Sequence, residues 1–150
     1  LLVARDVSHL TGERVGGNYL TKSNKSRKAD MYEEAESIWA DGAYVDAIDS
    51  FREYIKVYPG EYHAYKRIAE IYEKDLGSFR AAALEYEEML EMDIPKSRWG
   101  WAAIHLCNLY SGKLDDSDRA LALLQRVANE CSETTAGQKA RDRLAKIAAG

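Results

Sequence analysis

The chain has 150 residues, of which 46% are hydrophobic and 31% charged, and this length suits one domain with its own core. No run of about 18 apolar residues occurs, which excludes a transmembrane span within these residues. The formal net charge of −4 provides no general field that would attract nucleic acid.

Residues 1–28 are predicted to form an N-terminal extension that is partly irregular, because Gly12, Gly16 and Gly17 argue against a continuous helix. Six basic residues outnumber two acidic residues in this segment, so the other 122 residues carry a net charge of −8. The basic stretch from Lys22 to Lys28 is interpreted as a solvated linker. Contact with an anionic membrane surface or a phosphate is the alternative that this charge leaves open.

Residues 29–61 are predicted to form a pair of helices. Along the second helix, apolar residues recur at spacings of three and four, which gives one apolar face. These residues are Ala47, Ile48, Phe51, Tyr54 and Ile55. Pro59 and Gly60 follow and end the helix, since proline cannot continue it.

Residues 62–97 and 98–133 each repeat this pattern. Seven positions of residues 62–97 keep their broad class of side chain when 38 is added to the residue number, and no gap is needed. Ile68, Ala69, Tyr72, Leu76, Ala82, Tyr86 and Met89 correspond in this way to Leu106, Cys107, Tyr110, Leu114, Ala120, Leu124 and Val127. Residues 29–61 match residues 62–97 at an offset of 34 and then of 35, which indicates one inserted residue. We place this insertion at the turn between the two helices.

These hairpins resemble the tetratricopeptide repeat (TPR) family, whose unit has a small residue and an aromatic residue in its first helix, then glycine, aromatic, alanine and aromatic, and finally proline. The first segment matches at Ala35, Ile38, Gly42, Tyr44, Ala47, Phe51 and Pro59, and the second at Ala69, Tyr72, Gly77, Phe79, Ala82, Tyr86 and Pro95. The third diverges most, since Cys107 takes the small position and Leu114 and Asp115 replace the turn signature. The resemblance covers residues 29–133 and implies an all-α fold, an α-α superhelix built as a solenoid of antiparallel helix pairs.

Residues 134–149 are predicted to form a capping helix that begins at Thr134 or Thr135. One narrow apolar stripe runs along it, consisting of Ala136, Ala140, Leu144 and Ile147. A stacked array exposes an apolar end unless a helix with one polar face covers it. The segment is also similar in style to the closing helix of many bacterial TPR proteins.

The residues that could carry chemistry do not form a recognised motif. The sequence has no metalloprotease, phosphate-loop, nucleophile-elbow or dinucleotide-binding pattern. His9, His63 and His105 lie in separate elements, and two surface histidines are favoured over a metal site. We therefore expect no enzymatic activity, no cofactor and no metal.

Cys107 and Cys131 provide neither a disulfide framework nor a metal motif. Cys107 lies on an apolar helix face and is interpreted as a small core residue. Reduced thiols favour a cytoplasmic location, and a membrane-tethered or periplasmic location remains open.

In TPR proteins the first helices of successive repeats line a concave groove, and the resemblance implies which side chains line it here. The candidate partner-binding residues are Tyr32, Glu36, Trp39, His63, Lys66, Arg67, Glu70, Trp101, His105 and Asn108, with Lys74 and Ile104 at further groove positions. Aromatic and arginine side chains are favoured where binding energy concentrates. The alternative is that Tyr32, Trp39 or Trp101 packs against the N-terminal extension or completes the core.

The predicted function is a protein-interaction module that binds a peptide or protein segment in this groove, and not nucleic acid. Membrane contact would involve only the basic N-terminal extension. The alternative is a structural role, as a self-associating domain or as the soluble part of a larger, membrane-anchored protein. Light scattering at several concentrations separates the two hypotheses.

Overall fold

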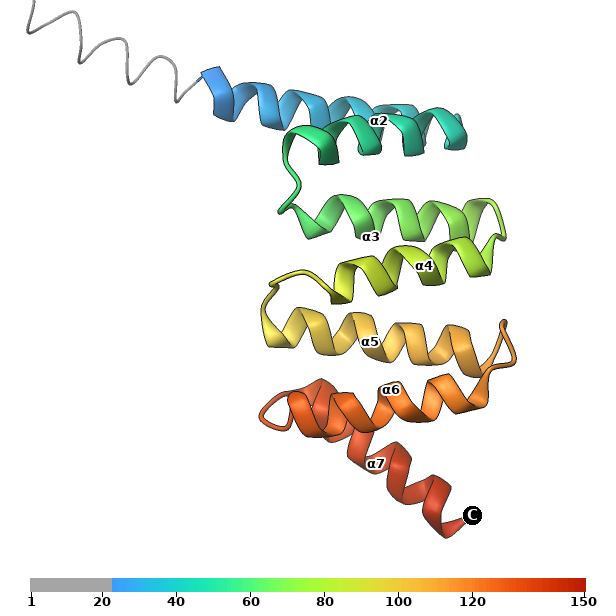
Figure 1. The fold of residues 1–150 in the computed structure, drawn as a ribbon. Coiled ribbons are helices and arrows are strands. Elements are labelled where there is room, and N and C mark those ends of the chain that lie inside the picture. The colour runs from blue at the N-terminus through green and yellow to red at the C-terminus, as the bar shows by residue number, and fades with distance from the viewer. Residues whose placement is uncertain (1–22) are drawn as a thin grey trace, which may run out of the picture. The chain divides into compact units, whose positions relative to one another are not determined.

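The structure is a computed structural model in which residues 23–150 are described, and this range is helical with no strand (Figure 1). The chain divides into two compact units, Leu1–Ser50 and Phe51–Gly150, with the boundary inside helix α2 (Tyr44–Val57). The predicted all-α fold is confirmed. No helix within residues 23–150 combines the length and the apolarity that a membrane crossing needs.

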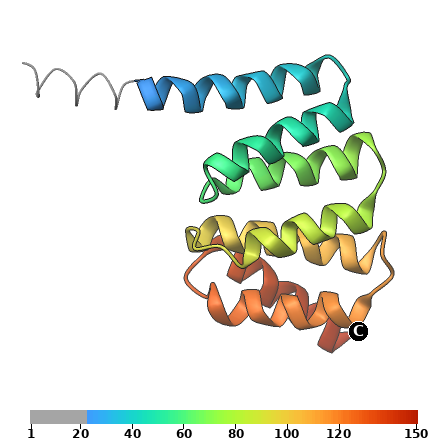
Figure 2. The same cartoon turned by 45° about the horizontal axis from the view of Figure 1, so that its top comes forward.

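The first unit contains a helix of residues 23–40 and the start of α2, joined by the turn visible in Figure 2. Gly42 has a φ of +81° there, and its N–H donates to the carbonyl of Trp39 at 2.9 Å. Ala35 and Ala47 are fully buried, as expected for small residues where helices approach closely.

The stretch of residues 23–28 was predicted as a linker, but it is part of this first helix. Residues 23–40 contain neither glycine nor proline, so nothing local stops the helix from extending into the basic segment. The glycines on which the irregular extension was predicted, Gly12, Gly16 and Gly17, lie outside the described residues.

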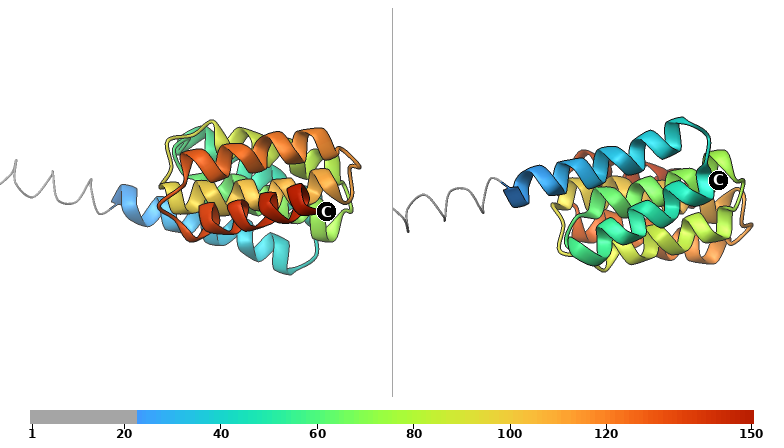
Figure 3. Two further views of the ribbon diagram at one scale, coloured as in Figure 1. Left: turned by 90° about the horizontal axis from the view of Figure 1, so that it is seen from below. Right: turned by 90° about the horizontal axis from the view of Figure 1, so that it is seen from above.

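The second unit is a series of consecutive antiparallel helices. Helix α3 (Tyr62–Glu70) continues into the short π-helix η1 (Ile71–Asp75) and packs against α4 (Phe79–Leu90). Helix α5 (Lys96–Ser111) packs against α4 on one side and α6 (Ser117–Glu130) on the other. Helix α7 (Thr135–Ala149) packs against α5 and α6, and Figure 3 shows α6 and α7 side by side.

The core of the second unit contains both small and large side chains. Ala69, Ala82, Ala103 and Cys107 are each 0% exposed, so the prediction that Cys107 is a small core residue is confirmed. The larger core residues belong to the same contiguous cluster: Tyr86, Met89, Trp99, Leu106, Tyr110, Leu124 and Val127. Burial of this apolar area is the main favourable contribution to the stability of the stack.

The inserted residue inferred from the repeat offsets lies within a helix and not in the turn between helices. It is accommodated by η1, where the N–H of Leu76 donates to the carbonyl of Ile71, five residues back, at 3.0 Å. One extra residue in a helix is commonly absorbed as such a π-turn. The same bond recurs 38 residues later, from Leu114 N–H to the Leu109 carbonyl at 2.9 Å.

Side-chain caps start the last two helices. The Asp116 carboxylate accepts from the N–H of Arg119 at 3.1 Å, and the Thr134 hydroxyl accepts from the N–H of Gly137 at 3.1 Å. Thr134 is therefore the cap of α7, one of the two candidates that the sequence offered.

The apolar stripe of α7 is buried only along its first half. Ala136 and Ala140 are 0% exposed and Leu144 is partly buried, but Ile147 is 58% exposed. The stripe therefore covers the core with its first residues, and Ile147 at its end is open to solvent.

Candidate functional site

A cleft of about 370 Å³ opens between α3, η1, α4 and α5, and it is called the α3–α5 cleft below. Its lining residues are Tyr62, His63, Lys66, Glu70, Lys74, Tyr86, Met89, Arg98, Trp101, Ala102 and His105. Residues four apart on a helix share a face, and Tyr62, Lys66, Glu70 and Lys74 follow this spacing along α3 and η1. The cleft is therefore the surface that one face of α3 and one face of α5 present together.

Six of the predicted groove residues are brought together in this cleft: His63, Lys66, Glu70, Lys74, Trp101 and His105. Arg67 does not line it, and its guanidinium donates to the Glu70 carboxylate at 3.0 Å. Asn108 also lies elsewhere, and its amide oxygen accepts from Arg143 at 2.9 Å.

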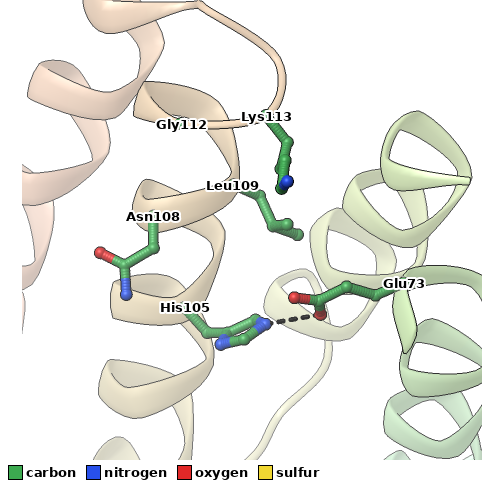
Figure 4. Close-up of a pocket in the computed structure, with 6 residues that line it drawn as sticks. All are labelled: Glu73, His105, Asn108, Leu109, Gly112 and Lys113. Carbon is green, nitrogen blue, oxygen red and sulfur yellow. Dashed lines mark hydrogen bonds and ion pairs between the residues drawn. The ribbon is translucent and has the colours of Figure 1, made fainter. Parts of the chain in front are cut away.

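A second hollow of about 440 Å³ adjoins the first and is lined by Glu73, His105, Asn108, Leu109, Gly112 and Lys113. Figure 4 shows the His105 ring directed toward Glu73, with a distance of 2.7 Å between Nε2 and the carboxylate oxygen. His105 lines both hollows, so this hydrogen bond fixes the side chain that stands between them. The sequence predicts His105 as a surface histidine at a groove position, and it did not reveal this bond to Glu73 on η1.

Trp101 is 45% exposed, so it does not complete the core. The ammonium of Lys139 on α7 lies 5.5 Å from the centre of its ring, a distance at which a cation is attracted to an aromatic face. The core position is taken instead by Trp99, which is 9% exposed and donates its indole N–H to the carbonyl of Leu90 at 2.9 Å.

Tyr32, Glu36 and Trp39 lie in the first unit, on the helix of residues 23–40, and all three are half-buried. Their spacing of four and then three residues places them on one face of that helix. Their assignment to the groove stays a prediction.

Ile104 was carried over as a groove position, but it is only 3% exposed and belongs to the core. Its neighbour His105 takes the open position, since successive helical residues point about 100° apart. Arg98 lines the cleft and was missed. It lies three residues before Trp101, so the helical spacing from Trp101 was the signal that could have found it.

The acidic side chains at the cleft already have cationic or histidine partners. Glu70 is paired with Arg67 at 3.0 Å and with Lys66 at 3.8 Å, while Glu73 is bonded to His105. Within the described part of the chain, neither Lys74 nor Arg98 has an acidic group at ion-pair distance. The cleft therefore has exposed positive charge that remains uncompensated.

Two titratable groups of the second unit have raised pKa values. Burial, together with the charges of Glu73 and Glu70, raises the pKa of Tyr86, so its hydroxyl stays protonated. Burial raises the pKa of the Cys107 thiol to about 11, which makes it a poor nucleophile. Across residues 23–150, no three His, Cys, Asp or Glu side chains are grouped to hold a metal ion.

Comparison by sequence finds no match, either to a protein-family model or to a curated protein. Comparison by structure finds clear similarity. The N-terminal domain of stress-induced protein-1 (STI-1) from C. elegans has a TM-score of 0.64 at 14% identity, covering 78% of this chain and 94% of that domain. PcrH in complex with the chaperone binding region of PopB has a TM-score of 0.59 at 16% identity, covering 81% of this chain and 94% of PcrH. At these identities the likeness is one of fold, and the fold of this chain is TPR-like.

Proposed function

We propose that the chain is a protein-interaction module whose α3–α5 cleft binds a segment of another protein. The observation that carries the proposal is the exposed indole of Trp101, which stands beside uncompensated cationic side chains at the edge of a cleft. A large aromatic side chain that remains exposed in a folded domain offers contact area at little entropic cost.

Two further points support a binding role. The cleft is built on helices and not on loops, so its side chains are held in place before a partner arrives, which lowers the entropic cost of association. PcrH, which has a similar fold, was solved in complex with the chaperone binding region of PopB. That complex supports a similar role for this chain.

The test compares the full chain with a double variant, Trp101→Ala with Lys66→Ala, in affinity capture from the native source followed by mass spectrometry. A partner that binds in the cleft is captured by the wild type and lost by the variant. The matched control is Ile147→Ala with Lys146→Ala, which removes an exposed apolar side chain and a lysine from the end of α7.

Far-UV circular dichroism establishes that both variants keep their helices. A partner that the cleft variant still retains at wild-type level would contradict the proposal. A chain that captures only copies of itself, with a molar mass that rises with concentration in light scattering, would favour the structural role instead.

A further inference from the structure

The charge of the α3–α5 cleft has the opposite sign to that of the chain around it. Three cationic residues line it, Lys66, Lys74 and Arg98, against one acidic residue, Glu70. The chain as a whole has a net charge of −4, and residues 29–150 have a net charge of −8. A local surplus of positive charge in an acidic protein is a feature that needs a physical reason.

The ion pairs within the cleft neutralise its one acidic residue and, among the residues described, leave two cationic residues unpaired. Glu70 is already satisfied by Arg67 and Lys66, so it offers little attraction to an incoming cation. Lys74 on η1 and Arg98 on α5 are both exposed, and no acidic partner for either exists among residues 23–150. A segment with carboxylates would meet two available cations from two different helices, whereas a basic segment would be repelled.

The cleft also has an apolar and aromatic surface beside its charges. Trp101 is 45% exposed, and buried Met89 and Ala102 lie on the cleft wall near it. The Tyr62 and His63 rings, 4.1 Å apart between centroids, line the same cleft. Aromatic and aliphatic side chains of a partner would gain from covering such surface.

From this juxtaposition we propose that the α3–α5 cleft selects an acidic segment of a partner protein that carries an aromatic or large aliphatic residue. Lys74 and Arg98 contact its carboxylates, and Trp101 contacts its apolar side chain. The inference rests on the proposed function and adds the chemistry of the partner. A nucleic acid is also anionic, but the net charge of −8 on residues 29–150 opposes a long polyanion more than a short acidic peptide.

The experiment pans a random library of peptides about 12 residues long on the immobilised full chain. The enriched peptides are sequenced, and the most enriched one is labelled for fluorescence anisotropy. Enrichment of peptides with net negative charge and at least one aromatic or large aliphatic residue is expected. Affinity should fall as salt is raised, because exposed charge pairs are screened.

The decisive variant is Lys74→Glu with Arg98→Glu. It should lower the affinity for the acidic peptide by at least about tenfold, since it replaces attraction by repulsion. The matched control is Arg80→Glu with Lys146→Glu, which changes the net charge by the same amount at exposed sites outside the cleft. The affinity of this control for the acidic peptide should stay within about twofold of wild type. Equal weakening by both variants would show a general charge effect and overturn the proposal.

The outcomes separate this inference from the proposed function. Enriched peptides that are neutral or basic, but that lose affinity in Trp101→Ala, would leave the binding role intact and refute the selection of acidic segments. Peptides that bind equally well to Trp101→Ala, or a library with no enriched peptide, would refute both. A single-stranded oligonucleotide that displaces the acidic peptide at lower concentration than the unlabelled peptide does would also overturn the assignment.

Discussion

Asp115 occupies the place in its helical hairpin that Gly77 occupies in the preceding one, 38 residues earlier, and both have a positive φ, 50° and 62° respectively. In both hairpins the residue that follows donates an equivalent backbone hydrogen bond to the end of the first helix. The N–H of Ser78 donates to Tyr72 and that of Asp116 to Tyr110, both at 2.7 Å. The third segment therefore keeps the left-handed turn of the repeat although it has lost the glycine. Aspartate is among the few residues other than glycine that adopt this conformation readily.

Gly77→Ala is expected to lower the free energy of unfolding by about 1 kcal/mol. The left-handed conformation costs an L-residue about 1–2 kcal/mol, and the smaller entropy of the unfolded chain offsets part of this cost. Urea unfolding followed by circular dichroism measures the change. Gly60→Ala is the matched control, because a Cβ there meets open space and φ is not positive, so its stability should equal or slightly exceed that of wild type. Equal losses in the two variants would contradict the role of the turn.

The close approach of α5 and α7 at Gly100 and Ala136 provides a second prediction. A Cβ on Gly100 would lie 2.9 Å from the Cβ of Ala136, which is closer than two carbon atoms can approach without a shift. Gly100→Ala should therefore destabilise the chain by about 1–3 kcal/mol, in the range of overpacked cores.

The exchange Gly100→Ala with Ala136→Gly removes this clash, because the next nearest atoms to the new Cβ are those of Cys131 at 3.5 and 3.6 Å. The double variant should be more stable than the sum of the two single changes predicts, by about 1 kcal/mol or more in a double-mutant cycle from urea unfolding. Additive effects would mean that α7 shifts freely on α5 and that the contact is not specific.

The features predicted correctly from the sequence are those set by local spacing. The buried small residues Ala35, Ala69 and Cys107 follow from the repeat register, and the Thr134 cap follows from the chemistry of helix N-termini. The register is visible in one sequence because the segment repeats within it, and the cap depends on a few neighbouring residues.

The features missed depend on where helices meet in space. The offset between segments revealed the inserted residue, but it did not show that η1 would absorb it and carry Glu73 toward His105. Likewise, Ile104 and His105 are adjacent in the chain, and only the packing of α5 decides that Ile104 is buried and His105 open. A small error in helix phase exchanges a core residue with a site residue.

Arg52 on α2 and Glu85 on α4 form a partly buried ion pair, in which Glu85 is only 6% exposed. The Arg52 guanidinium donates to both carboxylate oxygens, and this hydrogen bonding raises the pKa of Arg52. Arg52→Met leaves a buried carboxylate unpaired. We expect it to lower the free energy of unfolding by about 2–3 kcal/mol, less than for a fully buried pair because Arg52 is 39% exposed.

The control lies on the same helix. Lys56 forms an exposed pair with Glu53, so Lys56→Met should change stability by no more than about 0.5 kcal/mol. The double variant Arg52→Met with Glu85→Leu should recover most of the loss, because it removes the unpaired charge as well. A single Arg52→Met variant as stable as Lys56→Met would show that the pair does not hold α2 to α4.

Cys107 leads to a prediction about alkaline pH. Burial raises its pKa from 9.0 to about 11, so the folded chain holds the thiol proton more tightly than the unfolded chain. Stability is then fully present below pH 9 and falls as pH rises toward 11, with a slope approaching about 1.4 kcal/mol per pH unit for this group. Burial also raises the pKa values of Tyr86 and Tyr110, which adds to the decline above their ordinary value of 10.0.

Cys107→Ala removes the thiol and leaves both tyrosines, so its free energy of unfolding should decline less steeply than that of wild type between pH 9 and 10. Between pH 6 and 8 the contribution of this thiol to the pH dependence is absent, and the two curves should run parallel there, which controls for the change in packing. Urea titrations at half-unit pH intervals measure both ranges. Equal slopes above pH 9 would show that the thiol ionises as easily in the folded core as in water, which its complete burial argues against.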